Sequence, residues 1–281
     1  MKSDNINHIG ICGHRGSGRN TIAYLIANSL EYLLTTEFDK CEYHNKFTGW
    51  CDDIINDESA VYNLSLSKVY IESFSDDIKS YISLLTGIPL THLYSDYCKE
   101  HIAINLKDLS EVLIKDIDPA LIISREKLFE LRNTKKITQI LTDLYISLGD
   151  FILYFGYDVM QRFFGANFWI KSLKQNETKW DKNWNNDIVY KIYPDVKTEC
   201  ERDYIKDRGG LVIKVNRPTH KKTTSPLSKD IDYQEDMIIN SVEGLYDIEG
   251  DIYNTCTRIL LNNFGTIKND KSNDETNSKQ K

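Results

Sequence analysis

The sequence HIGICGHRGSGRNT, residues 8–21, decides the fold, because a short apolar run breaks into glycines and then opens a helix-forming segment. Glycines let backbone N–H groups turn inward onto phosphate oxygens, and the N-terminus of the following helix adds partial positive charge. A glycine-rich turn that binds no phosphate is the alternative. We predict a phosphate-binding loop whose nucleotide contacts come from Gly13, Gly16, Ser17, Gly18, Arg19, Asn20 and Thr21.

The loop departs from the usual pattern Gly-x4-Gly-Lys-[Ser/Thr], in which the lysine reaches the β- and γ-phosphates and the hydroxyl holds Mg2+. Gly13 and Gly18 keep the spacing. The lysine position holds Arg19, and the first hydroxyl falls one residue late, at Thr21. We assign Arg19 a catalytic role and Thr21 a role as metal ligand.

Composition limits the classes of function. The chain has 281 residues, 41% hydrophobic and 11% aromatic, which is enough for a substantial core. A net charge of -7 argues against nucleic acid as a partner, but a small anionic ligand in a local basic pocket remains compatible. The six scattered cysteines form no Cys-x-x-Cys pair, so we expect neither a zinc site nor a disulfide framework. No apolar run has the length of a membrane span and the first residues form no signal region, so we expect a soluble cytosolic protein.

The periodicity of apolar residues predicts an alternation of strands and helices. Strands are expected at 8–12, 69–74, 188–193 and 211–216, with weaker signals at 237–240 and 251–253. Helices are expected at 20–34, 76–85, 196–208 and 255–264, and the polar segment 35–67 is expected to be a loop. The alternation, with the glycine loop after the first strand, predicts an α/β fold of the P-loop kind, with helices flanking a parallel sheet.

The rest of the chain is assigned around that core. Helical spacing at 91–133 and 138–173 predicts a helical, substrate-binding insertion over about 90–175. One domain would span 1–264, with its core at about 6–36, 68–88 and 187–264. The polar segment 217–235 is a candidate lid, and 265–281 is expected to be a disordered tail.

Charged residues follow two of the expected strands. Asp195 comes after the strand at 188–193, and at the carboxyl end of a parallel strand it would face the crevice of the glycine loop. It could hold Mg2+ through water or cap the next helix, and the two roles are compatible. Asp76 or Asp77 is expected to cap the helix after the strand at 69–74. Lys79, one turn into that helix, could reach an acceptor phosphate or be solvated.

Several segments, in order, give a resemblance to a known family. Residues 13–21 resemble the Gly-x-x-x-Ser-Gly-Lys-Asp-Thr loop of the phage-type deoxynucleoside monophosphate kinases, a family related to animal phosphomevalonate kinase. That loop aligns without gaps and has its hydroxyl at the position of Thr21. Residues 73–79 resemble the family's Ser-Phe-Ala-Asp-Pro-Leu-Lys. Further similar segments lie at 156–159, 168–170, 195–197 with Glu201, 209–210, 215–218, 241–243 and 251–254, so the likeness spans residues 7 to about 264.

The resemblance implies transfer of the γ-phosphoryl group of ATP, with Mg2+, to a nucleoside monophosphate. It implies that Asp195 and Lys197 belong to the catalytic motif, Asp195 and Thr21 to the metal site, and Arg217 to the donor site. The acceptor would be bound by Asp76, Lys79, Lys99, Asp158 and Arg162.

The chain departs from the family at cationic positions. Arg19 replaces lysine, and Lys197 replaces the arginine of Asp-Val-Arg. Gly149, Leu153 and Gln161 stand where the family has Arg, Gln and Arg, with Arg162 one place away from the last. Three hypotheses follow: an active (deoxy)nucleoside monophosphate kinase, a catalytically impaired member that acts as a nucleotide-binding or scaffold protein, and a kinase of another small phospho-acceptor.

Some features stay open at this point. The Asn-, Ile- and Lys-rich composition suggests an AT-rich genome, viral or phage. The sequence does not fix the base or sugar that is accepted, and it leaves a homodimer open.

Overall fold

The computed structural model describes residues 7–14, 16–56, 66–107, 112–114, 118–133, 144–180, 189–217, 233–240 and 245–261. Within this part of the chain, no helix is long and apolar enough to cross a membrane. The expected tail at 265–281 and most of the candidate lid at 217–235 lie outside the described residues.

The core of the molecule is a five-stranded sheet in the order β2-β6-β1-β7-β8, and every neighbouring pair is parallel. The expected α/β architecture, a parallel sheet flanked by helices, is confirmed. The first strand is central, and its five interior residues are buried, as expected for a strand covered on both faces. The strand bounds are β1 Asn7–Gly13, β2 Val69–Ile71, β6 Tyr190–Val196, β7 Leu211–Asn216 and β8 Met237–Asn240.

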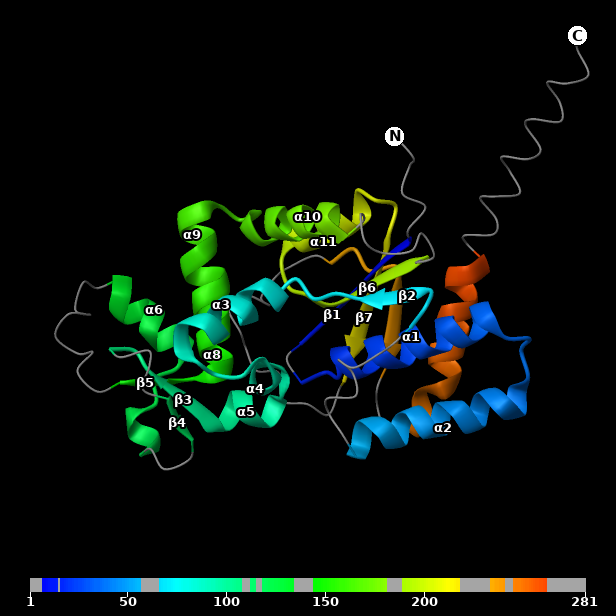
Figure 1. Ribbon diagram of the computed structural model, residues 1–281, viewed down its shortest axis with the longest axis horizontal. Helices are drawn as coiled ribbons and strands as arrows, with labels where there is room; N and C mark the ends of the chain where they lie inside the picture. Colours follow the sequence, from blue (N-terminus) through cyan, green and yellow to red (C-terminus); the bar gives the residue numbers. More distant parts are fainter. Residues whose placement is uncertain are drawn as a thin grey trace, which may run out of the picture.

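Helices cover both faces of this sheet (Figure 1). On one face α1 (Arg19–Thr35), α2 (Lys40–Asn56) and the helix at 249–261, which follows the short η5 (Tyr246–Ile248), share one hydrophobic cluster with the sheet. On the other face α10 (Phe168–Trp180) and α11 (Glu199–Lys206) pack over β6 and β7. The predicted helix at 20–34 is confirmed, and that at 196–208 is confirmed with a later start.

Two predictions outside the sheet are wrong. The expected loop at 35–67 contains α2, because Tyr43, Phe47 and Cys51 recur every four residues and bury one stripe against α1. The expected weak strand at 251–253 lies in the helix at 249–261, where Ile252, Cys256 and Ile259 form the buried stripe.

The insertion between β2 and β6 begins with the helix α3 and has its own hydrophobic cluster. It is not purely helical, because β3, β4 and β5 form an antiparallel sheet in the order β4-β3-β5. All four residues of β3 are buried, so the strand shows no alternation by which sequence could distinguish it from a helix. The bounds are α3 Asp76–Thr86, α4 Leu90–Tyr94, α5 Asp96–His101, β3 Ile102–Asn105, β4 Val112–Ile114, η2 Pro119–Leu121, α6 Arg125–Asn133, β5 Tyr145–Ser147, α8 Leu148–Leu153, η3 Tyr154–Met160 and α9 Gln161–Phe164.

Candidate functional site

The glycine loop connects the carboxyl end of β1 to the N-terminus of α1. Gly13, Gly16 and Gly18 have φ angles of 147°, 76° and 85°, values that side-chain-bearing residues rarely adopt. A Cβ on Gly13 would lie 2.5 Å from the carbonyl oxygen of Val215 in β7. Glycine is therefore required where the loop leaves the sheet.

Ser17 gives the loop an unsatisfied polar group. Its side-chain oxygen is buried and has no hydrogen-bond partner among the described residues. A buried hydroxyl without a partner costs about 1–3 kcal/mol, and an anion oxygen in the loop would relieve that cost. The first turn of α1 contains no acidic residue, and Gly18 at its N-cap has no side chain to accept from the helix N–H groups. The loop thus fits a phosphate group by conformation, charge and hydrogen bonding.

The other predicted loop residues occupy the start of α1. Arg19, Asn20 and Thr21 form its first turn and are partly exposed. Arg217 directly follows β7, two residues after Val215, which pairs with Gly13. Its exposed side chain therefore starts at the same edge of the sheet as the loop.

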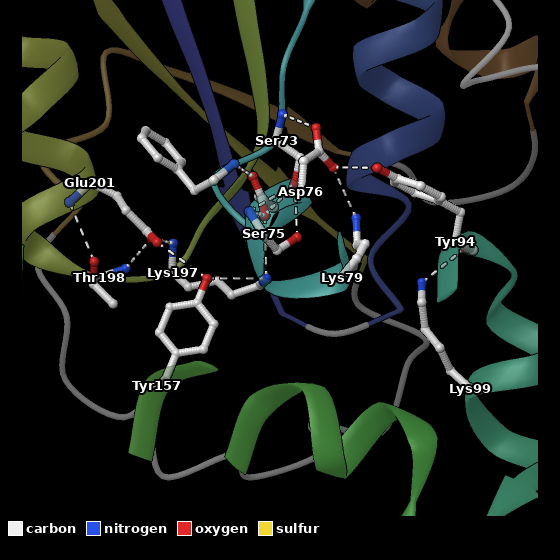
Figure 2. A network of polar contacts seen from close by, with 12 residues as sticks. Ser73, Ser75, Asp76, Lys79, Tyr94, Lys99, Tyr157, Lys197, Thr198 and Glu201 are labelled. Atoms are coloured by element: carbon white, nitrogen blue, oxygen red, sulfur yellow. Dashed lines mark hydrogen bonds and ion pairs between the residues drawn. The ribbon is translucent and has the colours of Figure 1, made fainter. Parts of the chain in front are cut away.

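Asp195 is a buried acidic residue of the site, and Figure 2 shows its partners Ser73, Ser75 and Lys197. It is the penultimate residue of β6, and its carboxylate accepts from the Ser73 hydroxyl (2.6 Å) and the N–H groups of Phe74 (2.9 Å) and Ser75 (3.0 Å). Burial opposes ionisation, but the ammonium groups of Lys197 and Lys79 and the serine hydrogen bonds hold the Asp195 pKa well below its ordinary value. Asp195 is thus an anion that fixes the turn between β2 and α3.

The expected helix-capping roles of the aspartates are wrong. Asp195 lies within the strand, and Thr198 caps α11 instead. Ser75 occupies the N-cap of α3, which places Asp76 and Asp77 in the first turn. The Asp76 carboxylate accepts from the backbone N–H of Ser73, and that of Asp77 accepts from the Ser172 hydroxyl in α10. Asp76 therefore bonds a residue before the helix and Asp77 a residue of another helix, and neither carboxylate caps α3.

Lys79 and Lys197 each pair with a different acidic residue of the site. The Lys197 ammonium lies 3.4 Å from the Asp195 carboxylate. Lys79 is buried, with its ammonium 3.4 Å from Asp76 and 3.9 Å from the centroid of the Tyr94 ring. The Tyr94 hydroxyl donates to the same Asp76 oxygen at 2.7 Å. The solvated alternative for Lys79 is therefore wrong, because the side chain is enclosed by its neighbours.

Lys99 joins the same group of cations. Its ammonium donates to Asp96 (2.7 Å) and to the carbonyl of Tyr94 (3.0 Å). Burial lowers the Lys99 pKa, the nearby cations Lys79 and Lys197 lower it further, and Asp96 opposes them. Arg19 in turn helps to lower the pKa of Lys197 after the larger effect of burial. Arg19, Lys79, Lys99 and Lys197 therefore share one electrostatic environment, which favours an anionic ligand.

Glu201 and Tyr157 complete the site, although the sequence pattern assigns neither of them a role in it. Glu201 accepts from the backbone N–H groups of Lys197 (2.6 Å) and Thr198 (2.9 Å), and from the Tyr157 hydroxyl (3.2 Å). Thr198-x-x-Glu201 is a capping box, a sequence pattern from which the position of Glu201 at the start of α11 could be predicted. Tyr157 comes from η3, a π-helix that the sequence pattern does not reveal.

Asp158 and Arg162 lie in a different polar group. The Asp158 carboxylate is 2.9 Å from Nε of the buried Arg125, and Arg162 lies over the Phe129 ring. Burial raises the Asp158 pKa, while Arg125 and Arg162 oppose the rise. The structure therefore groups these two predicted acceptor residues with α6 rather than with Lys79 and Lys99. No sequence motif singles out Arg125.

The residues present suit contact with a hydrated Mg2+ ion better than direct coordination of a resident metal. The Asp195 carboxylate already accepts three hydrogen bonds and pairs with Lys197, which suits contact with a hydrated ion rather than direct coordination. Thr21 offers a partly exposed hydroxyl in the first turn of α1. Among the described residues, no group of three or more His, Cys, Asp or Glu side chains could hold a metal ion.

Comparisons with known proteins leave the family open. No protein-family model matches the chain, and no curated protein matches it.

Glu201 gives a prediction about pH and stability. Burial and the Asp195 carboxylate raise the Glu201 pKa to about 7, against the opposing effects of Lys197 and the backbone N–H groups. Above the ordinary pKa of 4.5, the folded chain therefore retains a proton that the unfolded chain releases, so stability falls as the pH rises from 4.5 through 7. Glu201→Gln has no proton to release at this position, so this loss of stability is absent from the variant. We expect the difference in free energy of unfolding, variant minus wild type, to increase by on the order of 1–3 kcal/mol from pH 4.5 to pH 8.

Urea denaturation of both proteins at several pH values measures the difference. Other titrating groups are common to the two chains and cancel. A difference that is the same at pH 4.5 and pH 8 would show that Glu201 titrates normally.

Proposed function

We propose that the chain is a nucleoside monophosphate kinase that transfers the γ-phosphoryl group of ATP to a (deoxy)nucleoside monophosphate. The observation that carries this proposal is the buried Asp195, which pairs with Lys197 and is stabilised as an anion by Lys79, beside a glycine loop with an unpartnered hydroxyl. The charges of Arg19 and Lys99 interact with that of Lys197. Phosphoryl transfer requires positioning and positive charge above all, because the transferred group carries negative charge on its equatorial oxygens.

Each part of the site has a role in this proposal. The glycine loop and Arg19 hold the β- and γ-phosphates of ATP, and Arg217 contacts the donor. Lys79 and Lys99 stand on α3 and α5, on the side of the insertion, and bind the acceptor phosphate. Lys197 faces the transferring group, with Asp195 keeping its ammonium in place. Mg2+, when bound with ATP, neutralises charge on the β- and γ-phosphates.

Nucleotide binding without turnover is a second candidate, and one observation favours it. Gly149 is buried, and Leu153 packs in the hydrophobic cluster of the insertion, so two positions that are polar in the resembling family belong to the core here. The acceptor site would then lack polar side chains at these two positions to contact the substrate.

The test uses the purified full chain with ATP, Mg2+ and each common ribo- and deoxyribonucleoside monophosphate, and also phosphomevalonate. ADP is quantified by chromatography against blanks without acceptor and without protein. We expect ADP to form with at least one nucleoside monophosphate. Calorimetry with Mg2+ and ATP is run in parallel. Binding without ADP above the blank for any acceptor rejects the kinase and supports the second candidate, whereas absence of binding rejects both.

A further inference from the structure

The insertion reaches the catalytic part of the site through Tyr157. The backbone of η3 is fixed at the preceding residue, because the Gly156 carbonyl accepts from Nε1 of Trp169 at 2.7 Å. A Cβ on Gly156 would lie 2.6 Å from Cδ1 of Ile78, so η3 packs closely on α3 as well. The direction of the Tyr157 side chain is therefore set by two other helices. π-Helical turns of this kind recur at functional sites.

The Tyr157 hydroxyl lies between two groups of the core (Figure 2). It donates to the Glu201 carboxylate at 3.2 Å, which leaves its lone pairs for the Lys197 ammonium at 3.5 Å. The same ammonium lies 5.2 Å from the centroid of the Tyr157 ring. Tyr157 and Glu201 are both buried, so these contacts are shielded from solvent.

Lys197 is held at both ends by this arrangement. Glu201 accepts from its backbone N–H at 2.6 Å, and Tyr157 and Asp195 contact its ammonium. Tyr157 is the member of this set that comes from the insertion, and Glu201 and Asp195 belong to the sheet core. The contact thus joins the acceptor side of the site to the donor side.

We propose that Tyr157 is a positioning residue, whose hydroxyl, oriented by Glu201, holds the Lys197 ammonium beside Asp195 during phosphoryl transfer. The proposal rests on the proposed kinase function. It makes turnover depend on the contact between the insertion and the core. In the proposed mechanism, Tyr157 itself contacts no reacting atom.

The kinetic test is Tyr157→Phe, which keeps the ring and removes the hydroxyl. We expect kcat to fall about tenfold or more, because the ammonium is less well placed, while the KM for ATP stays within about twofold. The matched control is Tyr43→Phe, which removes a buried hydroxyl that bonds Ser29 at 3.0 Å in the cluster that α1 and α2 form with the sheet. The control is expected to keep the wild-type kcat and to lower the unfolding temperature by about as much as Tyr157→Phe does.

A second readout does not require turnover. Acylation of Lys197 at a fixed pH is followed by mass spectrometry, with the exposed Lys46 as the internal reference. We expect Lys197 to react about two- to tenfold faster in Tyr157→Phe, the change in population that loss of one hydrogen bond produces.

The two readouts separate the proposals. Unchanged acylation, or an unchanged kcat in an active enzyme, overturns the positioning role. A wild-type protein that forms no ADP with any acceptor overturns the kinase function, while faster acylation would still support the hold of Tyr157 on Lys197.

Discussion

Arg19→Ala is expected to abolish measurable turnover, with a fall in kcat of about 10^3-fold or more. Arg19 is the first residue of α1, and its charge acts on Lys197 and Tyr157 across the site. Its removal leaves the glycine loop without the side chain that stands at the position of the usual phosphate-contacting lysine. An arginine that contacts a transferring phosphoryl group contributes this much in known phosphotransferases.

Arg19→Lys tests whether an ammonium group can replace the guanidinium in this loop. A compact ammonium is the usual group in such a loop, whereas the guanidinium is wider and planar. We therefore expect Arg19→Lys to retain or raise kcat. Arg258→Ala serves as the control, because Arg258 is exposed on the helix at 249–261. ADP formation and calorimetric ATP binding are measured for all three, and normal turnover by Arg19→Ala would show that the loop is not the phosphate site.

The sequence predicts the sheet well because its strands differ locally from the helices between them. The strand at 211–216 follows Gly209 and Gly210 and is rich in β-branched residues, and the structure gives β7 the same bounds. The helix at 76–85 ends as expected, with Gly87 in the left-handed conformation just after α3. The segment at 35–67 was predicted wrongly because its buried stripe is aromatic and spread among many polar residues.

The site residues that can be predicted from the sequence are those at the carboxyl ends of strands. Asp195 is predictable because the carboxyl ends of parallel strands share one edge of the sheet. Its partners Ser73 and Ser75 lie more than a hundred residues away in the chain, so no local pattern links them to it. Tyr157 enters through a π-helix, and Arg125 through a contact between α6 and η3. Tertiary packing brings these residues into their contacts, and neither the periodicity nor the spacing of residues in the sequence predicts it.

Asp195→Asn is expected to damage both activity and stability, because one carboxylate organises the whole site. The change removes the anion that pairs with Lys197 and offsets Lys79, and it places an amide where three donors converge. Removing one partner of a buried ion pair costs about 3–5 kcal/mol. Displacement of Lys197 and of the turn before α3 should lower kcat about 10^2-fold or more.

The pH dependence of that loss identifies the carboxylate as its source. The folded-state pKa of Asp195 lies below its ordinary value of 3.8, so its stabilisation is present above that pH and is lost as the pH falls through the folded pKa. The difference in free energy of unfolding between wild type and Asp195→Asn should therefore be full at pH 7 and shrink once the pH drops below 3.8. Asp207→Asn, at an exposed position after α11, is the matched control and should show neither effect. If the difference in free energy of unfolding stays the same at acidic pH, the shape of the Asp195 side chain rather than its charge stabilises the fold. The interaction of Lys197 and Lys79 with this carboxylate would then no longer support the proposed role in phosphoryl transfer.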